Sequence, residues 1–185
     1  MDKFKGILFA ALSAATFGLI PLYANQSILD GVNNETILVY RYGIAGSVYA
    51  IYLLIRRMNM RLTRREVKEV TLAGVGGYGI TAFFLMWSYH YMPTGVATAI
   101  HFFYPVVVAL LMAIFYKERL PLEVKAGIVL AICGVYLLSW TPGEVKWLGL
   151  FFVLMSTVTY GCYITALNRP VLKRMNPDVL TCYVL

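Results

Sequence analysis

Arg41 is a charged side chain inside a stretch of sequence that is otherwise apolar. It stands in residues 36–55, roughly 7 Å from the nearer end of that stretch at the rise of an α-helix. A guanidinium at this depth can bind an anion such as a carboxylate, because its donors lie in a fixed plane. It can also extend to the nearest water or cap the helices around it. The sequence leaves both roles open.

His101 and Pro105 form a second unusual pair, one helical turn apart. His101 lies roughly 10 Å from the start of the apolar stretch 94–116, and Tyr104 and Pro105 share its face. Pro105 has no N–H, so the carbonyl of His101 loses its helical partner. Within a membrane, such a carbonyl needs a polar partner or a water-lined cavity. His101 is therefore either a satisfied structural group or part of a cavity.

Aromatic side chains are abundant, and most of them fit a membrane interface or a lipid-facing surface. Tyr78 and Tyr104 lie near the middle of their stretches, where an interfacial position does not explain them. We therefore expect Arg41, Tyr78, Trp87, His101 and Tyr104 to line one aromatic solute cavity. Arg41 would attract a carboxylate there, and the other four would form the walls.

Motifs of soluble enzymes are absent from the sequence. It has no HExxH, no GxSxG and no Walker loop, and the one carboxylate within an apolar stretch, Glu123, lies at the end of its stretch. Residues 74–79, GVGGYG, fit GxGxxG, but a dinucleotide fingerprint follows a strand, and these residues lie inside an apolar helical stretch. We expect them to serve close packing or flexibility. The three cysteines lack metal-site spacing, so neither a metal nor a cofactor is predicted.

The elements that must position these residues are membrane-spanning helices. The sequence is 60% hydrophobic, with a mean hydropathy of +0.71 and runs of about twenty residues that are nearly free of charge. We predict an all-α, polytopic helical bundle with six complete spans and the start of a seventh. The complete spans are residues 6–24, 36–55, 70–91, 94–116, 122–140 and 147–167, and the seventh begins near residue 179.

The net charge of +7 follows the expected topology. Fourteen of the sixteen Lys and Arg residues fall in alternate connections, on the same side of the predicted membrane as the N-terminus. The positive-inside rule therefore predicts a multi-pass protein of the cell or inner membrane with a cytoplasmic N-terminus. Because the charge is explained in this way, the bilayer is the expected partner and nucleic acid is not.

Residues 6–42 recur, without a gap, at residues 149–185. The offset of 143 positions carries Gly6, Ser13, Thr16, Gly18, Asn25, Leu29, Asn33 and Tyr40 onto identical residues. Five predicted spans separate the copies, so the second copy starts from the opposite side, as in an inverted repeat. We assign 1–143 to a first five-helix unit and 144–185 to the start of a second. Two such units need about 286 residues, so we expect an incomplete transporter.

Small residues at four-residue intervals predict where these helices pack against one another. The pairs are Gly6 with Ala10, Ala14 with Gly18, Gly43 with Ser47, Gly46 with Ala50, Gly95 with Ala99, and Gly127 with Ala131. We expect them to form the seams of the bundle.

The stretch from the third to the fifth span resembles the EamA domain of the drug/metabolite transporter superfamily. The resemblance rests on residues 92–100 (MPTGVATAI), 109–111 (ALL) and 117–120 (KERL), together with Gly127 and Gly134. It implies ten helices in two inverted repeats, a central cavity and transport of small organic solutes, often outward. Arg41, Pro105 and Glu118 also match positions of its pattern, and we take Pro105 and Glu118 as structural residues.

These observations predict a secondary or facilitative transporter that exports a small organic metabolite by alternating access. An amino-acid-like solute is preferred because of Arg41. A multidrug efflux pump is the alternative within transport, although short drug-resistance pumps carry an acidic residue in their first helix and this first span has none. A membrane enzyme or assembly factor is the weaker alternative. A homodimer is left open.

Overall fold

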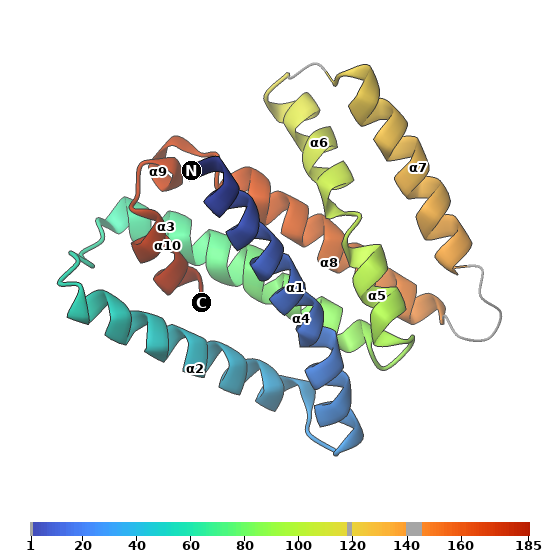
Figure 1. Cartoon of the computed structure of the whole chain (residues 1–185), viewed down its shortest axis with the longest axis horizontal. Helices are drawn as coiled ribbons and strands as arrows, with labels where there is room; N and C mark the ends of the chain where they lie inside the picture. The colour runs from blue at the N-terminus through green and yellow to red at the C-terminus, as the bar shows by residue number, and fades with distance from the viewer. Residues whose placement is uncertain (1, 118–119, 140–145) are drawn as a thin grey trace.

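A computed structural model describes residues 2–117, 120–139 and 146–185, and the described residues form helices without a strand (Figure 1). In chain order the elements are α1 (Asp2–Leu29), α2 (Asn34–Ile55), α3 (Arg64–Ala73), the π-helix η1 (Gly74–Gly79), α4 (Ile80–Ser88), α5 (Thr94–His101), α6 (Tyr104–Phe115), α7 (Leu122–Ser139), α8 (Trp147–Ala166), α9 (Pro170–Lys173) and α10 (Pro177–Val184).

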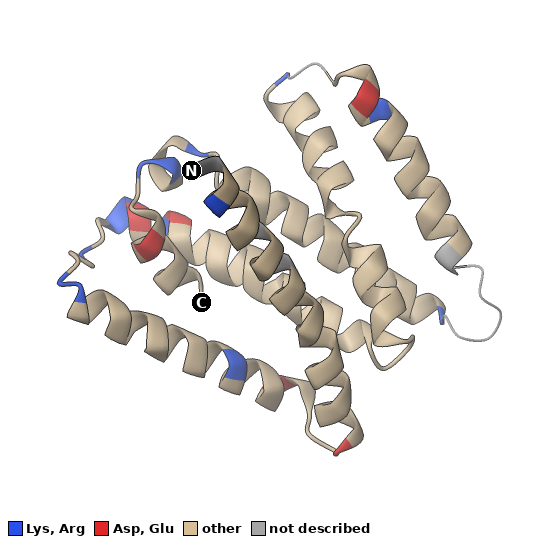
Figure 2. Cartoon of the chain, viewed as in Figure 1, with Lys and Arg blue, Asp and Glu red and all other residues tan. Residues whose placement is uncertain are grey.

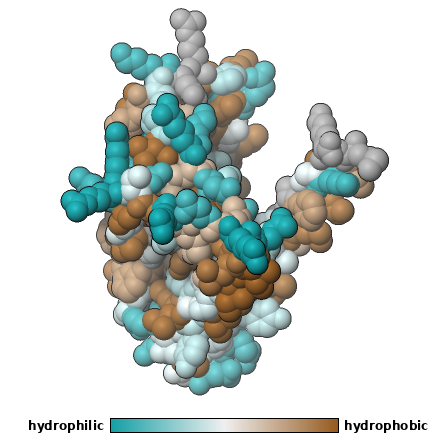
Figure 3. All heavy atoms as spheres, turned by 90° about the vertical axis from the view of Figure 1, so that its left-hand side faces the viewer, coloured by the Kyte–Doolittle hydropathy of each residue, from teal (hydrophilic) through white to brown (hydrophobic). Residues whose placement is uncertain are grey.

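The helices have the length and composition of membrane spans. Five stretches of the described residues are long and apolar enough to cross a bilayer, and they confirm five of the expected spans: Phe4–Leu29, Asn34–Ile55, Arg64–Ser88, Thr94–Phe115 and Trp147–Ala166. Helix α7 covers the remaining complete span up to Ser139, and Trp140 lies outside the described residues. Broad hydrophobic surface lies between hydrophilic groups (Figure 3), as expected for a chain that faces lipid. The protein is an all-α, multi-pass membrane protein.

Side-chain caps fix where several helices begin. The Asn33 side chain accepts a hydrogen bond from the backbone N–H of Thr36 at the start of α2. At the start of α3, Thr63 and Glu66 form a reciprocal capping box. Asn176 caps α10 by accepting from the N–H of Asp178. Each cap satisfies a backbone donor that the first helical turn leaves unpaired.

The third and fourth spans both depart from regular α-helix. In the third, the GVGGYG segment forms the π-helix η1 between α3 and α4. In the fourth, α5 ends at His101 and α6 begins at Tyr104, with Pro105 in its first turn. The interruption that Pro105 predicts is therefore present, because a proline fits the first turn of a helix but not its interior.

Helix α8 lies at the centre of the bundle and packs against α4, α5 and α6 (Figure 1). Its closest approaches use glycines. A Cβ added to Gly161 would lie 2.6 Å from Cγ1 of Val107, and one added to Gly149 would lie 2.6 Å from Cβ of Tyr91. On the facing helix, a Cβ added to Gly77 would lie 2.8 Å from Cβ of Tyr163. The close-packing role expected of the GVGGYG segment is thus confirmed at Gly77.

Five of the glycines expected at seams have no close neighbour among the described residues. No heavy atom outside the local helix lies within 4 Å of a Cβ added to Gly6, Gly18, Gly43, Gly95 or Gly127. The prediction was wrong for these positions because small residues permit close approach but do not specify a neighbour. Close approach occurs instead at glycines of α8 and η1.

The two copies of the sequence repeat share local structure. The Thr16 hydroxyl donates to the carbonyls of Leu12 and Ser13, and Thr159 donates to those of Met155 and Ser156, which are the same positions shifted by 143. The capping residues Asn33 and Asn176 are another matched pair. Figure 1 shows α1 starting at the end of the bundle where α8 finishes, so the two helices run in opposite directions.

Candidate functional site

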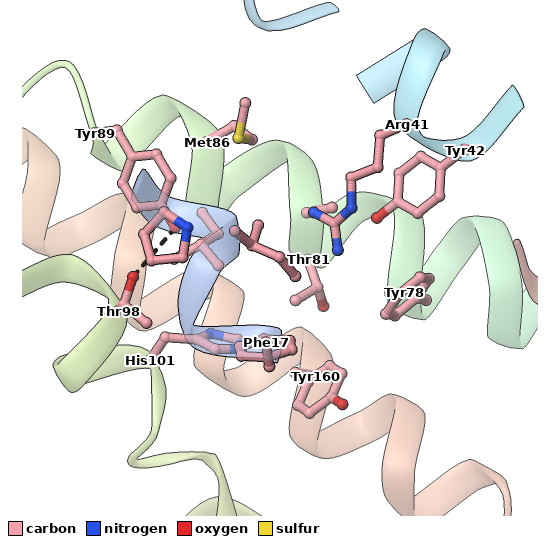
Figure 4. Close-up of a pocket in the computed structure, with 14 residues that line it drawn as sticks. Phe17, Arg41, Tyr42, Tyr78, Thr81, Met86, Tyr89, Thr98, His101 and Tyr160 are labelled. Carbon is pink, nitrogen blue, oxygen red and sulfur yellow. Dashed lines mark hydrogen bonds between the residues drawn. The ribbon is translucent and has the colours of Figure 1, made fainter. Parts of the chain in front are cut away.

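A small cavity of about 30 Å³ lies in the interior, between α1, α2, η1, α4, α5 and α8 (Figure 4). Most of its walls are apolar or aromatic, and none of the residues that line it is acidic. The lining residues are Phe17, Ile20, Pro21, Arg41, Tyr42, Tyr78, Thr81, Ala82, Leu85, Met86, Tyr89, Thr98, His101 and Tyr160. Three of the five residues expected to line a cavity, Arg41, Tyr78 and His101, are brought together in it.

Arg41 is the charged group of this cavity, and it extends from α2 toward α4 (Figure 4). Its guanidinium carbon lies 5.3 Å from the centre of the Tyr42 ring. The ion pair found within the described ranges joins Arg169 to Glu69, and no carboxylate there lies within ion-pair distance of Arg41. A half-buried cation without a protein counter-ion in an apolar cavity favours an anion as its partner.

Tyr42 supplies a second polar group beside Arg41. Its hydroxyl is buried and has no hydrogen-bond partner among the described residues. Buried hydroxyls normally find a partner, so this one marks a position where a ligand atom can bind. Sequence reasoning missed Tyr42, although it directly follows Arg41 and lies in the same apolar stretch.

Three other hydroxyls of the cavity, those of Thr81, Tyr89 and Thr98, are hydrogen-bonded within the protein. The hydroxyl of Thr81 lies 2.8 Å from that of Thr159 and also donates to the Gly77 carbonyl. The Tyr89 and Thr98 hydroxyls lie 3.2 Å apart (Figure 4). By contrast, the Tyr42 hydroxyl beside Arg41 keeps its hydrogen-bonding capacity for a solute.

Tyrosine rings of α2, η1 and α8 pack against one another beside the cavity. The Tyr78 ring centre lies 5.6 Å from that of Tyr42, 6.4 Å from that of Tyr160 and 5.5 Å from that of Tyr163. Rings at these separations and tilts pack favourably and hold each other in place. Tyr160 lines the cavity although sequence reasoning did not select it, because its place depends on α8 lying beside η1.

His101 is buried, and it joins α5 to α8. Its Nδ1 atom lies 3.0 Å from Oγ of Ser156, whose own hydrogen is donated to the Val153 carbonyl. Nδ1 therefore carries the hydrogen and donates it to Ser156, because a hydroxyl has a single proton to give. Both of the roles left open for His101 are combined, since it is hydrogen-bonded and also lines the cavity.

Tyr104 and Trp87 do not line this cavity. The Tyr104 ring packs edge-to-face against Tyr160, with ring centres 4.6 Å apart, and of these two residues only Tyr160 lines the cavity. Trp87 instead packs against Phe83, His90 and Phe152. Its Nε1 atom is buried without a hydrogen-bond partner among the described residues. The direction in which each ring points depends on the rotation of its helix, which depth along the span does not determine.

A larger cavity of about 390 Å³ lies next to the small one, between α1 and α2. It shares Ile20, Arg41 and Met86 with the small cavity, so Arg41 lines both. The remaining lining residues are Thr16, Leu19, Tyr23, Ala24, Ser27 and Ile37. Neither cavity contains an acidic side chain.

Of the two structural residues expected from the sequence, one lies among the described residues. Pro105 lies in the first turn of α6 and is exposed. Glu118 lies outside the described residues. Within the part of the chain that the structure describes, no three His, Cys, Asp or Glu side chains are grouped so that they could hold a metal ion.

Comparison with known proteins identifies relatives among transporters. Residues 4–140 match the EamA-like transporter family. An uncharacterized transporter of Archaeoglobus fulgidus is 27% identical over 178 residues, which cover 96% of this chain and 58% of the relative. A probable terminal-alkyne amino-acid exporter of Streptantibioticus cattleyicolor is 27% identical over 154 residues, covering 78% of this chain and 52% of the relative.

The chain thus spans between about half and three fifths of the length of these curated relatives. An uncharacterized transporter of Haemophilus influenzae is also similar, at 28% identity over 133 residues, covering 70% of this chain and 42% of the relative. No solved structure matches the chain.

Proposed function

The chain belongs to the EamA-like transporter family, and from this premise we propose that it forms the solute site of a transporter for small organic carboxylates. The observation that carries the proposal is the arginine without a counter-ion beside a tyrosine hydroxyl without a partner, both among the described residues. A carboxylate has two oxygens, so it can accept from the Arg41 guanidinium and from the Tyr42 hydroxyl at once. No acidic side chain of the two cavities competes for Arg41.

An amino-acid-like metabolite is the preferred solute within this class. The relative from Streptantibioticus cattleyicolor is named as an amino-acid exporter, and this supports the preference without fixing it. Tyrosine faces such as those of Tyr78 and Tyr160 can attract an ammonium group by cation–π interaction, so the absence of an acidic side chain from the cavity lining does not exclude an amino group. Export is the preferred direction.

Multidrug efflux is the rival within transport, because an aromatic cavity suits many apolar solutes. Its typical substrates are cations, and an unpaired arginine repels them unless an acidic residue is near. Arg41 therefore favours anionic or zwitterionic solutes over cationic drugs.

Alternating access through an inverted repeat is the proposed mechanism. The matched hydrogen bonds of Thr16 and Thr159, the matched caps Asn33 and Asn176, and the opposite directions of α1 and α8 support it. Two halves with the same local structure and opposite orientation can exchange conformations, so that one site opens to each side in turn. The proposal includes a cytoplasmic N-terminus.

Charge distribution supports this orientation. Basic residues gather where the N-terminus, the α2–α3 connection and α9 lie, and near the α6–α7 connection (Figure 2). The α1–α2 connection at the other end carries acidic residues and no basic residue. Positive charge is retained on the cytoplasmic side of membrane proteins, so the N-terminal end is the cytoplasmic end in this proposal.

The test compares two solutes that differ in the carboxylate. Counterflow of L-norvaline and of its carboxamide is measured in proteoliposomes with the native protein and with Arg41→Ala. We expect Arg41→Ala to weaken the affinity for L-norvaline at least about tenfold, since a charge-assisted hydrogen bond contributes about 1.5–3 kcal/mol. The carboxamide is a cation, which Arg41 repels, so its affinity should not weaken. Arg57→Ala, which removes an exposed arginine outside the spans, is the control. Equal losses for both solutes would assign Arg41 a structural role and refute the proposal.

A further inference from the structure

Two cavities of very different size meet at Arg41. The inner one measures about 30 Å³ and the outer one about 390 Å³, and both are lined by Ile20, Arg41 and Met86. A cavity needs roughly 10–15 Å³ of such volume to hold one water molecule, so the inner cavity accommodates a group of about two or three water-sized atoms. The outer cavity lies within the range of roughly 300–1,000 Å³ typical of small-molecule sites.

The two cavities also differ in chemistry. The inner cavity holds the unpaired Tyr42 hydroxyl next to the Arg41 guanidinium. The outer cavity is bounded mainly by apolar side chains, including Leu19 of α1 and Ile37 of α2. Its Thr16 hydroxyl is occupied by backbone carbonyls of its own helix. A charged group thus finds partners in the inner cavity, whereas the outer cavity offers apolar contact.

We propose that the two cavities are the two halves of one binding site, which takes a carboxylate with an apolar chain. The carboxylate occupies the inner cavity on Arg41 and Tyr42, and the chain extends past Ile20 and Met86 into the outer cavity between α1 and α2. The inference rests on the proposed function, because it assumes that Arg41 binds the carboxylate. The inference adds two things to that function: the apolar chain, which sets selectivity among solutes, and the residues that recognise this chain.

Leu19 and Tyr23 are the specificity-determining residues on α1. Both line the outer cavity and neither lines the inner one. Each buried methylene of the chain contributes apolar contact worth about fourfold in affinity. Affinity therefore rises with chain length until the outer cavity is filled.

The experiment uses a series of L-amino acids that differ by single methylenes: alanine, 2-aminobutyrate, norvaline and norleucine. The concentration of each that halves counterflow of labelled norvaline is measured with the native protein in proteoliposomes. We expect an improvement of about fourfold for each added methylene. In Leu19→Ser and Tyr23→Ser, the improvement per methylene should fall below about twofold, because the lost apolar contact is made by the chain of the solute.

Leu8→Ser is the matched control for Leu19→Ser. Leu8 is 47% exposed and Leu19 is 45% exposed on the same helix, but Leu8 lines neither cavity. The control should keep the native dependence on chain length. Arg41→Ala should weaken the affinity for all four amino acids by the same factor. It should also keep the dependence of affinity on chain length, because Arg41 contacts the carboxylate that all four share.

The outcomes separate this inference from the proposed function. Carboxylate-dependent transport with equal affinity for all four amino acids overturns the divided site and leaves the proposed function standing. An equal loss of affinity for alanine and for norleucine in Leu19→Ser also overturns the divided site, since Leu19 would then be a structural residue. No counterflow of any member of the series, with the protein present in the vesicles, overturns both.

Discussion

The Nδ1 atom of His101 lies 3.0 Å from Oγ of Ser156, and this hydrogen bond joins the fourth span to α8 beside the cavity. Ser156 is also the repeat partner of Ser13 on α1. The contact therefore links the last residue of α5 to the copy of the repeat that begins at Gly149. Both partners are buried, so the bond cannot be replaced by bulk water without opening the bundle.

Ser156→Ala should destabilise the protein, because it leaves the Nδ1–H of His101 without an acceptor. Hydrogen bonds between membrane helices contribute on the order of 0.6 kcal/mol and up to about 1.7 kcal/mol, so a lower unfolding midpoint in detergent is expected. Ser47→Ala, at an exposed position of α2, is the control and should unfold like the native protein. An unchanged midpoint in Ser156→Ala would show that His101 finds another partner.

Gly161→Val should disturb the packing of α8 on α6. A Cβ at this position lies 2.6 Å from Cγ1 of Val107, and overpacking a close contact costs about 1–3 kcal/mol. Gly127→Val is the matched change on α7, where a Cβ meets no atom within 4 Å. Thermal unfolding in detergent should separate the two variants clearly. Similar midpoints would contradict the close packing of α6 against α8.

Trp87→Phe should leave solute affinity unchanged, although the sequence alone placed Trp87 in the cavity wall. Its indole packs against Phe83 and Phe152 away from the small cavity, and its Nε1 has no partner among the described residues. Phenylalanine removes this unsatisfied donor, so stability should be retained or slightly increased. The half-saturation concentration for norvaline counterflow measures the first effect. A severalfold increase in this concentration would show that Trp87 contributes to the binding site.

Cysteines placed at the two ends of the first spans should be labelled from opposite sides. In a background without Cys133, Cys162 and Cys182, Arg61→Cys is expected to react only with a cytoplasmic reagent, and Asp30→Cys only with an external one. A membrane-impermeant maleimide applied to intact cells and to inverted vesicles distinguishes the sides. Labelling of both cysteines from one side would refute the topology and, with it, the inverted repeat.

Much of the fold could be predicted because membrane spans are a local property of the sequence. Twenty apolar residues must satisfy their backbone groups internally, and within lipid this means a helix. Asn33 and Thr63 mark helix starts by the same local logic, since their side chains cap the turn that follows them. The break before Pro105 is equally local.

The candidate site was accessible to sequence reasoning only in part. Arg41, Tyr78 and His101 could be selected because a charge, a mid-depth aromatic and a buried imidazole are each unusual in an apolar span. Tyr42 and Tyr160 carry no such signal, because one more tyrosine among many does not stand out. What distinguishes them is a neighbour: an unpaired hydroxyl beside Arg41 for Tyr42, and the packing of α8 on η1 for Tyr160.

The sequence by itself therefore determined the helices, their apolar character and the presence of an arginine within a span. The tertiary structure decided which side chains meet. In it, Trp87 and Tyr104 lie outside the cavity lining. Gly6 and Gly18 have no close neighbour, whereas Gly149 and Gly161 are tightly packed. The physical reason is that depth and helix type follow from neighbours in the chain. Contact between helices depends on their rotation and order in space, which residues far apart in the chain determine together.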